Sequence, residues 1–290
     1  MTLDTMDCIT SGRVIVNGDD FGMSPGVNAA VKRLHAAGRL SSVSIMSNMP
    51  WSADALAYAR GAPVLQAGAH LNLTTGRPLR PLEQVPSLVD DSGEFLDLPV
   101  MLRRLLAGRV SRDEIRLELG AQLVRCLEEG PEIQHVDSHM HFHAVPSLGR
   151  LVTDLASRHG VPKVRNPDFG AFVMPPPNEI SPVRKALHKA GARVLISTQR
   201  VLNSRNIALT GPEPNARQLI YLRWCLELED DPAAAFRTCL CDLDFGKLEI
   251  IAHPAELDDV LPSLSGYVEG RELELEFLAS DTFRELMEDL

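Results

Sequence analysis

The sequence predicts one α/β domain built on a mostly parallel sheet. Short β-branched runs alternate with amphipathic stretches along the chain, and polar residues that can carry chemistry recur where those runs end. Alternating strands and helices are typical of parallel sheets covered by crossover helices. The 290 residues suit a single domain of this class, because α/β barrels often reach that length. We therefore expect a tail at residues 1–12 and one domain over residues 13–290.

The first half of the chain carries clear signals for strand–helix units. Ser24 followed by Pro25 supplies an N-cap and a proline at the first helical position. Ser111 and Glu114 have the spacing of a capping box. The expected strands lie at residues 13–16, 42–46, 64–74 and 133–143, the helices at 24–38, 53–60, 111–127 and 148–155, a break at 17–22 and a long loop at 76–100.

The second half gives weaker signals. The three consecutive prolines before residue 178 require a loop, because proline continues neither a helix nor an inner strand. The expected elements are strands at residues 163–165 and 248–252, a loop at 174–177, a helix from Ser181, a mostly helical stretch at 212–240 and a helix capped by Ser280.

The most informative stretch is residues 133–143, which packs four histidines and one aspartate into nine positions. If the whole stretch is extended, its side chains alternate and the polar set shares one face: His135, Asp137, His139, His141 and His143. A core would have to supply each imidazole with a hydrogen-bond partner. Imidazole and carboxylate together form the donor set of zinc and other divalent metals. The stretch predicts a metal site without indicating which histidines bind.

Polar residues also end other expected strands. Asp19 and Asp20 follow the first strand, His70 lies in the third, and His253 follows the last. Taken alone, the aspartate pair indicates a solvated turn and His70 a hydrogen-bonded interior histidine. Active sites of β/α barrels and open α/β sheets lie at the C-terminal ends of the strands. We therefore expect these residues and the histidine stretch to meet at one edge of the sheet.

Composition and missing motifs argue against several other functions. A net charge of −10 disfavours a nucleic-acid partner, which needs a basic surface. The five cysteines are odd in number and irregularly spaced, as expected of reduced thiols in a cytoplasmic protein. The acidic N-terminus is unlike a signal peptide, and no apolar run is long enough to span a bilayer. Nucleophile-elbow, dinucleotide and phosphate-loop motifs are missing from the sequence.

Four motifs resemble those of the YdjC-like carbohydrate deacetylases, a family that includes chitooligosaccharide deacetylases and hopanoid-biosynthesis-associated deacetylases. They are Val-Asn-Gly-Asp-Asp-Phe-Gly-Met-Ser at residues 16–24, Gly-Ala-His-Leu-Asn-Leu-Thr at 68–74, His-Val-Asp-Ser-His-Met-His-Phe-His at 135–143 and Ile-Ala-His-Pro at 251–254. Two positions depart from the family pattern. Gly18 replaces the alanine usual before the aspartate pair, and Ala252 replaces a cysteine often found before the histidine.

The resemblance implies a distorted (β/α) barrel of the sugar deacetylase type and one divalent metal ion, Mg²⁺ or Zn²⁺. The implied reaction is hydrolysis of the N-acetyl group of an N-acetylglucosamine-containing sugar. The implied roles are metal binding by Asp20, His70 and His139, general base for Asp19, general acid for His253, and orientation of the base by Arg165. The residues left to orient the ligands or touch the sugar are Asp137, His141 and His143.

Two alternative functions remain open from the residues. A metal-dependent phosphoesterase or amidohydrolase could use the same rim, although such enzymes usually carry an H-x-H motif where this chain has its aspartate pair. A catalytically silent metal- or sugar-binding domain is disfavoured, because a candidate base and acid are both present. The sequence does not distinguish a free oligosaccharide from a conjugate, or a monomer from a homodimer. The candidate substrate walls are the loops around Trp51, residues 78–99 and residues 169–177.

Overall fold

The computed structural model describes residues 14–165, 213–214, 218–240 and 248–288. The expected tail at residues 1–12, the loop at 174–177 and the helix from Ser181 lie outside this part of the chain. Across the described ranges, no helix combines the length and the apolar character needed to cross a membrane.

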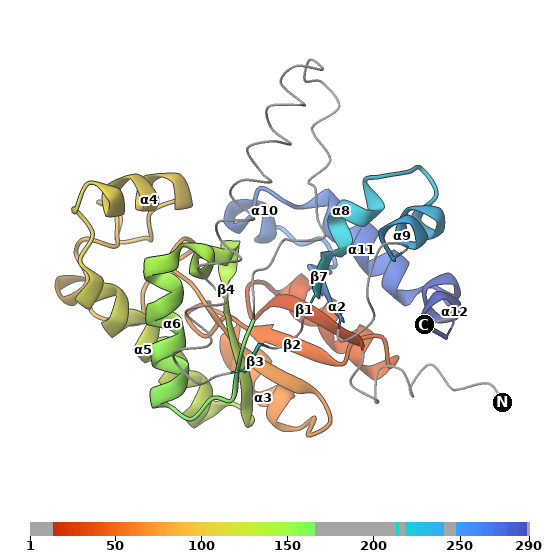
Figure 1. Cartoon of the computed structure of the whole chain (residues 1–290), viewed down its shortest axis with the longest axis horizontal. Helices are drawn as coiled ribbons and strands as arrows, with labels where there is room; N and C mark the ends of the chain where they lie inside the picture. Colours follow the sequence, from red (N-terminus) through yellow and green to blue (C-terminus); the bar gives the residue numbers. More distant parts are fainter. Residues whose placement is uncertain (1–13, 166–212, 215–217, 241–247, 289–290) are drawn as a thin grey trace, which may run out of the picture.

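The described strands form a single eight-stranded sheet in the order β6-β5-β4-β3-β2-β1-β8-β7, and every pairing between neighbours is parallel. Figure 1 shows β1, β2, β3 and β4 at the centre of the molecule. The predicted α/β class is therefore confirmed. The sheet is a curled half-barrel, with β6 and β7 at the two ends of the described strand order. The strands are β1 Val14–Phe21, β2 Ser42–Ile45, β3 Gln66–Leu71, β4 Ile133–Ser138, β5 Lys163–Val164, β6 Glu213–Pro214, β7 Gln218–Tyr221 and β8 Leu248–Ala252.

Helices cover the sheet and enclose the core. In Figure 1, α5 and α6 lie together on one side of the sheet, and the C-terminal helices α8, α9, α11 and α12 lie on the other. The core includes the fully buried strand residues Val16, Ile45, Val136 and Ile250. The helices are α2 Pro25–Ala36, α3 Ser52–Arg60, α4 Leu98–Leu106, α5 Arg112–Glu129, α6 Pro146–Arg158, α8 Leu222–Leu226, α9 Pro232–Leu240, α10 Leu261–Leu264, α11 Glu269–Ala279 and α12 Asp281–Glu288, with 3-10 turns η1 Leu82–Gln84 and η2 His139–Ala144.

The predicted helix caps are present. Ser24 Oγ accepts a hydrogen bond from the backbone N–H of Val27 at 3.2 Å, which satisfies one of the free donors at the start of α2. Ser111 Oγ accepts from the N–H of Glu114 at 3.3 Å. Only half of the capping box forms there, because the Glu114 carboxylate accepts from the N–H of Ser87 instead.

Strand β1 is longer than predicted. The residue pattern predicts an end at residue 16, but the strand continues to Phe21 and includes the aspartate pair. Its register against β2 shifts between Gly18 and Phe21, and Asp20 has a φ of 65°. Such a bulge redirects side chains and is common beside active sites. Strand β8 pairs with β1 as far as Gly18, and β2 pairs again with Phe21 beyond the bulge, so that the strand continues past these polar residues.

The histidine strand is shorter than predicted. Strand β4 ends at Ser138, and His139–Ala144 form a 3-10 turn in which Met140 and His141 have positive φ angles of 54° and 48°. The expectation that five polar residues share one face is therefore wrong beyond Asp137. Period-two alternation holds only while the backbone stays extended, and left-handed backbone at two non-glycine residues is not visible in the residue pattern.

Two further elements differ from the expectation. The stretch at residues 212–240 contains the short strand β7 before its helices. A run as short as Gln-Leu-Ile-Tyr cannot be separated from buried helix by periodicity. Helix α4 begins at Leu98, within the expected loop at residues 76–100, and Asp97 caps it by accepting from the N–H of Val100.

Gly68 on β3 faces the imidazole of His135 on β4. A Cβ atom at Gly68 would lie 2.2 Å from Nε2 of His135. The His135 side chain is buried, and its Nε2 also lies 3.2 Å from Ser44 Oγ. We expect Gly68→Ala to lower the free energy of unfolding by about 1–3 kcal/mol in urea titrations, the usual scale for overpacking. The matched control is Gly120→Ala on α5, where the nearest atom would be 3.8 Å away. It should be neutral or stabilising by up to about 1 kcal/mol, and equal losses at both positions would contradict the argument.

Candidate metal centre

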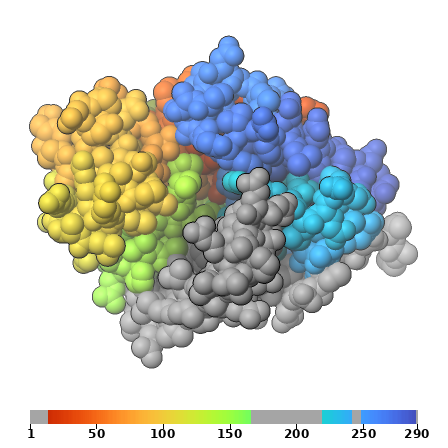
Figure 2. Space-filling model, turned by 90° about the horizontal axis from the view of Figure 1, so that it is seen from above, coloured from red at the N-terminus to blue at the C-terminus, as the bar shows by residue number. Residues whose placement is uncertain are grey.

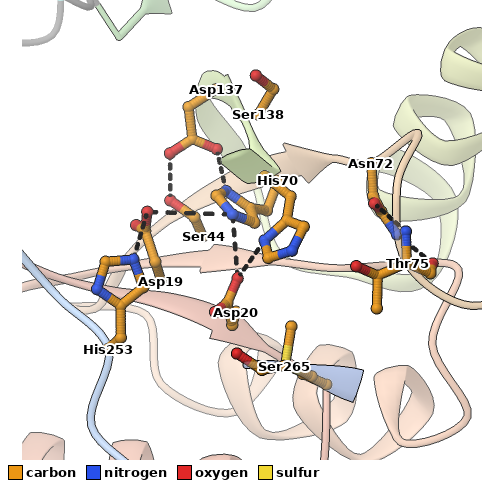
Figure 3. Close-up of polar contacts among 12 residues, drawn as sticks. Asp19, Asp20, Ser44, His70, Asn72, Thr75, Asp137, Ser138, His253 and Ser265 are labelled. Carbon is orange, nitrogen blue, oxygen red and sulfur yellow. Dashed lines mark hydrogen bonds and ion pairs between the residues drawn. The ribbon is translucent and has the colours of Figure 1, made fainter. Parts of the chain in front are cut away.

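The predicted site residues from the ends of four strands meet at one edge of the sheet. Asp19 and Asp20 come from β1, His70 from β3, Asp137 from β4 and His253 from the loop after β8, and Figure 3 shows their side chains converging. Carboxyl ends of parallel strands lie on the same edge, which explains how segments far apart in sequence assemble. His139 joins them from the turn that follows β4.

Three of these side chains form a buried cluster with metal-ligand chemistry. Asp20, His70 and His139 each offer one ligand atom, and these atoms all lie within 4.8 Å of one another. Asp20 Oδ1 is 2.8 Å from Nδ1 of His139 and 3.2 Å from Nε2 of His70. One carboxylate with two imidazoles suits zinc and other divalent ions, and three protein ligands leave coordination positions open, as a catalytic metal requires.

His70 is fixed in orientation by Asp137. Its Nδ1 donates to Asp137 Oδ1 at 2.7 Å, so that Nε2 points at Asp20. Metal-binding histidines commonly hold a carboxylate at the other ring nitrogen in this way. Burial lowers the pKa of His70, but Asp137 and Asp19 outweigh it and raise that pKa to about 10. The expected roles of Asp137 are to orient a ligand or to touch the sugar, and its hydrogen bond to His70 favours the first of these roles.

Asp19, His70 and Asp137 form a second triplet whose ligand atoms also lie within 4.8 Å. Both carboxylates in it are already paired with Arg165, which donates to Asp19 at 2.8 Å and lies 2.7 Å from Asp137. Asp20 has no contact with Arg165 among the described interactions. Both oxygens of Asp19 accept from Arg165, whereas Asp20 meets an arginine, Arg271, through Oδ2 and keeps Oδ1 facing the two histidines. This geometry favours Asp20 over Asp19 as the metal ligand.

Arg271 on α11 is a site residue that the sequence analysis missed. Its Nη2 donates to Asp20 Oδ2 at 2.7 Å, on the side of the carboxylate away from the histidines. Burial raises the pKa of Asp20, but His139 and Arg271 reverse this and hold it well below its usual value. Nothing in the local sequence marks Arg271, which is separated from Asp20 by 251 positions.

Arg165 lies next to the aspartate pair, as the family resemblance implied. It is fully buried and donates two hydrogen bonds to Asp19 and one to Glu249 on β8, each of 2.8 Å. Burial raises the pKa of Asp19, whereas Arg165 and His70 lower it, and the net pKa lies below the usual value. Asp19 is therefore an oriented, ionised carboxylate at neutral pH.

His253 is the last of the predicted site residues and also lies beside Asp19. Its Nε2 lies 3.9 Å from Asp19 Oδ2, and its backbone N–H donates to Glu274 at 2.6 Å. Burial lowers the pKa of His253 to about 4. The structure thus brings together the candidate base and acid beside the candidate metal ligands.

The remaining two histidines of the predicted set lie apart from this cluster. His143 is buried, where Nδ1 contacts Ser138 Oγ and Nε2 donates to the carbonyl of Arg165 at 3.2 Å. It supports the loop that carries the arginine and does not face the ligands. His141 packs its ring against Tyr221, with 5.1 Å between ring centroids, and lines the pocket above the cluster.

A pocket of about 580 Å³ opens over the cluster. Asp19, Asp20 and His139 lie on its floor, and Tyr221, Trp224, Arg223 and Tyr267 form part of its wall. Figure 2 shows a hollow between the yellow segment around α4 and the blue C-terminal helices. Of the candidate substrate walls, residues 97–99 line it, Trp51 does not, and residues 169–177 lie outside the described chain.

His139→Ala should strip or weaken the bound metal. The substitution removes one of three ligand atoms and leaves only Asp20 and His70. We expect the metal content after dialysis, measured by atomic emission, to fall well below that of the wild type. The exposed His159 on the far end of α6 provides the control, and His159→Ala should retain the metal. Unchanged metal content in His139→Ala would remove His139 from the ligand set.

Fold and site together define a parallel α/β protein with a buried carboxylate–histidine centre at the C-terminal edge of its sheet. The chain belongs to the YdjC-like protein family, whose model matches residues 13–289. This confirms the resemblance seen in the four motifs.

Relatives and a solved structure extend over nearly the whole chain. A carbohydrate deacetylase of Brevibacillus brevis is 31% identical over 280 residues, or 96% of this chain and 95% of that protein. A carbohydrate deacetylase of Thermoanaerobacter pseudethanolicus is 28% identical over 95% of this chain and 94% of its own. The crystal structure of an Enterococcus faecalis V583 protein assigned to cellobiose-phosphate cleavage has a TM-score of 0.71 at 25% identity, covering 95% of this chain and 94% of that one.

Proposed function

We propose that this protein is a metal-dependent carbohydrate N-deacetylase, which hydrolyses the N-acetyl group of an N-acetylglucosamine-containing sugar and releases acetate. The observation that carries the proposal is the buried Asp20, His70 and His139 cluster, with Asp19 and His253 beside it at the floor of one pocket. The names of the Brevibacillus and Thermoanaerobacter relatives support the reaction class.

The residues present fit a divalent ion, because one buried carboxylate and two buried imidazoles each offer a ligand atom to the same place. A bound ion would polarise the acetamide carbonyl and lower the pKa of a water molecule. Asp19 faces the same space and, held ionised by Arg165, accepts the proton of the attacking water. His253, on the other side of Asp19, donates a proton to the departing amine.

The pocket walls suit a sugar. Tyr221 and Trp224 lie with 4.3 Å between ring centroids at an interplanar angle of 40°, and aromatic rings pack well against the apolar faces of sugar rings. Thr74, Thr75 and Ser265 add hydroxyl groups that can hydrogen-bond sugar hydroxyls. A chitooligosaccharide or an N-acetylglucosamine conjugate fits this combination, and the donor set accepts Zn²⁺ or Mg²⁺.

Acetate release from N,N′-diacetylchitobiose by the chelator-treated protein, with and without added Zn²⁺ or Mg²⁺, tests the proposal. We expect release that depends on the metal. An N-acetylglucosaminyl conjugate, such as an aryl glycoside, serves as the second substrate. Hydrolysis of p-nitrophenyl phosphate without acetate release from either sugar would indicate a phosphoesterase. Sugar binding without turnover would indicate a silent binding domain.

A further inference from the structure

Glu274 on α11 is a buried carboxylate with no role in the mechanism above. Its side chain is fully buried. Oε2 accepts the backbone N–H of His253 at 2.6 Å, and Oε1 accepts the hydroxyl of Tyr267 at 2.6 Å. Burial raises the pKa of Glu274 to about 7. A buried carboxyl group is costly unless its surroundings compensate it, so its place directly behind His253 requires an explanation.

The imidazole of His253 lies between two carboxylates. Nε2 is 3.9 Å from Asp19 Oδ2 on the pocket side, and Nδ1 is 3.9 Å from Glu274 Oε1 on the buried side. Nδ1 has no hydrogen-bond partner within the described part of the chain. Hydrogen bonds of catalytic groups are often long without substrate and shorten in the complex. Glu274 is thus the acceptor that Nδ1 faces.

We propose that Glu274 is the positioning residue of the general acid: it holds the backbone of His253 and accepts its Nδ1–H while Nε2–H protonates the leaving amine. This inference rests on the proposed function. The carbon–nitrogen bond breaks with its electron pair on nitrogen, the Nε2 proton moves to that nitrogen, and the acetate keeps the oxygen of the water. The step requires both ring protons on His253, and a negatively charged Glu274 facing Nδ1 favours that doubly protonated form against the burial that lowers the pKa of His253. After the step His253 recovers a proton from solvent. A third group that orients a catalytic imidazole is a recurrent arrangement.

The other charged groups near His253 do not share this position. Burial lowers the pKa of His253, and the charges that act on it come from Asp20, Asp19, Arg271 and His70. The aspartates come from β1 and His70 from β3, whereas Arg271 and Glu274 come from α11. In the described structure, Glu274 is the carboxylate that contacts both the backbone N–H and the Nδ1 side of His253.

Glu274→Gln tests the inference, because glutamine keeps the shape and an acceptor for the His253 backbone but loses the negative charge. We expect the kcat for N-acetyl sugar hydrolysis to fall at least about tenfold, a modest fraction of the usual contribution of general acid catalysis. Hydrolysis of p-nitrophenyl acetate should stay within about twofold, since p-nitrophenolate leaves without a proton. The control is Glu276→Gln on the exposed face of α11, which should change neither rate.

A double-mutant cycle with His253→Ala provides the second measurement. If Glu274 acts through His253, Glu274→Gln should have no further effect on amide hydrolysis in the His253→Ala background. Equal losses on amide and ester, or an unchanged loss in that background, would show a purely structural role and overturn the inference. If the wild type hydrolyses the amide and Glu274→Gln does so at the same rate, the inference about Glu274 is wrong while the proposed function stands. A wild type without amide hydrolysis would overturn the proposed function and this inference together.

Discussion

Asp19→Asn is expected to lower the kcat for acetate release at least about 100-fold while the protein keeps its metal, the usual scale for removing a positioned base. Asparagine has the shape of aspartate but cannot take the proton of the attacking water. Both oxygens of Asp19 are hydrogen-bonded to Arg165, and the ligand atoms of the favoured triplet come from other residues. Steady-state kinetics and atomic emission on the same preparation measure the two properties together.

The metal content of Asp19→Asn shows which aspartate of the pair binds the metal and which is the general base. Asp113→Asn on the exposed start of α5 is the matched control, because it makes the same change outside the pocket and should alter neither property. Asp19 also belongs to the second triplet with His70 and Asp137. Loss of the metal in Asp19→Asn would therefore mean that this second triplet binds it and that our division of roles is wrong.

Local signals predicted those parts of the fold that depend on nearest neighbours. The caps at Ser24 and Ser111 fixed the starts of α2 and α5, and buried β-branched runs marked β2 and β8. The C-terminal edge rule then placed the four motifs together, because all strand pairings are parallel. The candidate base, the candidate acid and the three candidate ligands meet because their motifs lie at strand ends and all the described strands are parallel.

Residues without a local signature could not be found in this way. Arg271 and Glu274 lie on a helix whose pattern resembles an ordinary charged surface, and only the folded chain shows that these two side chains turn inward. The turn after β4 depends on left-handed backbone at Met140 and His141, and two consecutive non-glycine residues rarely adopt it, although histidine does so more often than most. Such backbone occurs where the surrounding structure imposes it, often at functional sites.

Arg165→Met should destabilise the metal-free protein by about 3–5 kcal/mol, the scale for breaking a buried ion pair on one side. The fully buried guanidinium contacts Asp19, Asp137 and Glu249, and methionine would remove it from all three carboxylates at once. Urea unfolding at neutral pH measures the loss. The control is Arg116→Met, which breaks an exposed pair with Asp113 and should cost at most about 1 kcal/mol.

The difference between the wild type and Arg165→Met should shrink as the pH falls. In the wild type, the pKa of Asp19 and that of Asp137 lie below their usual values, since burial raises both but Arg165 leads the effects that lower them. A carboxyl group with a lowered folded-state pKa stabilises the protein above its unfolded pKa and loses this effect on acidification. Without Arg165, burial dominates and the folded-state pKa values rise, so that protonation at low pH removes the unpaired buried charges of the variant.

Glu249→Gln should also recover part of the stability lost in Arg165→Met, because it removes one of the three buried carboxylates that lack the guanidinium. A loss below about 1 kcal/mol at neutral pH would mean that the carboxylates have found water or another cation.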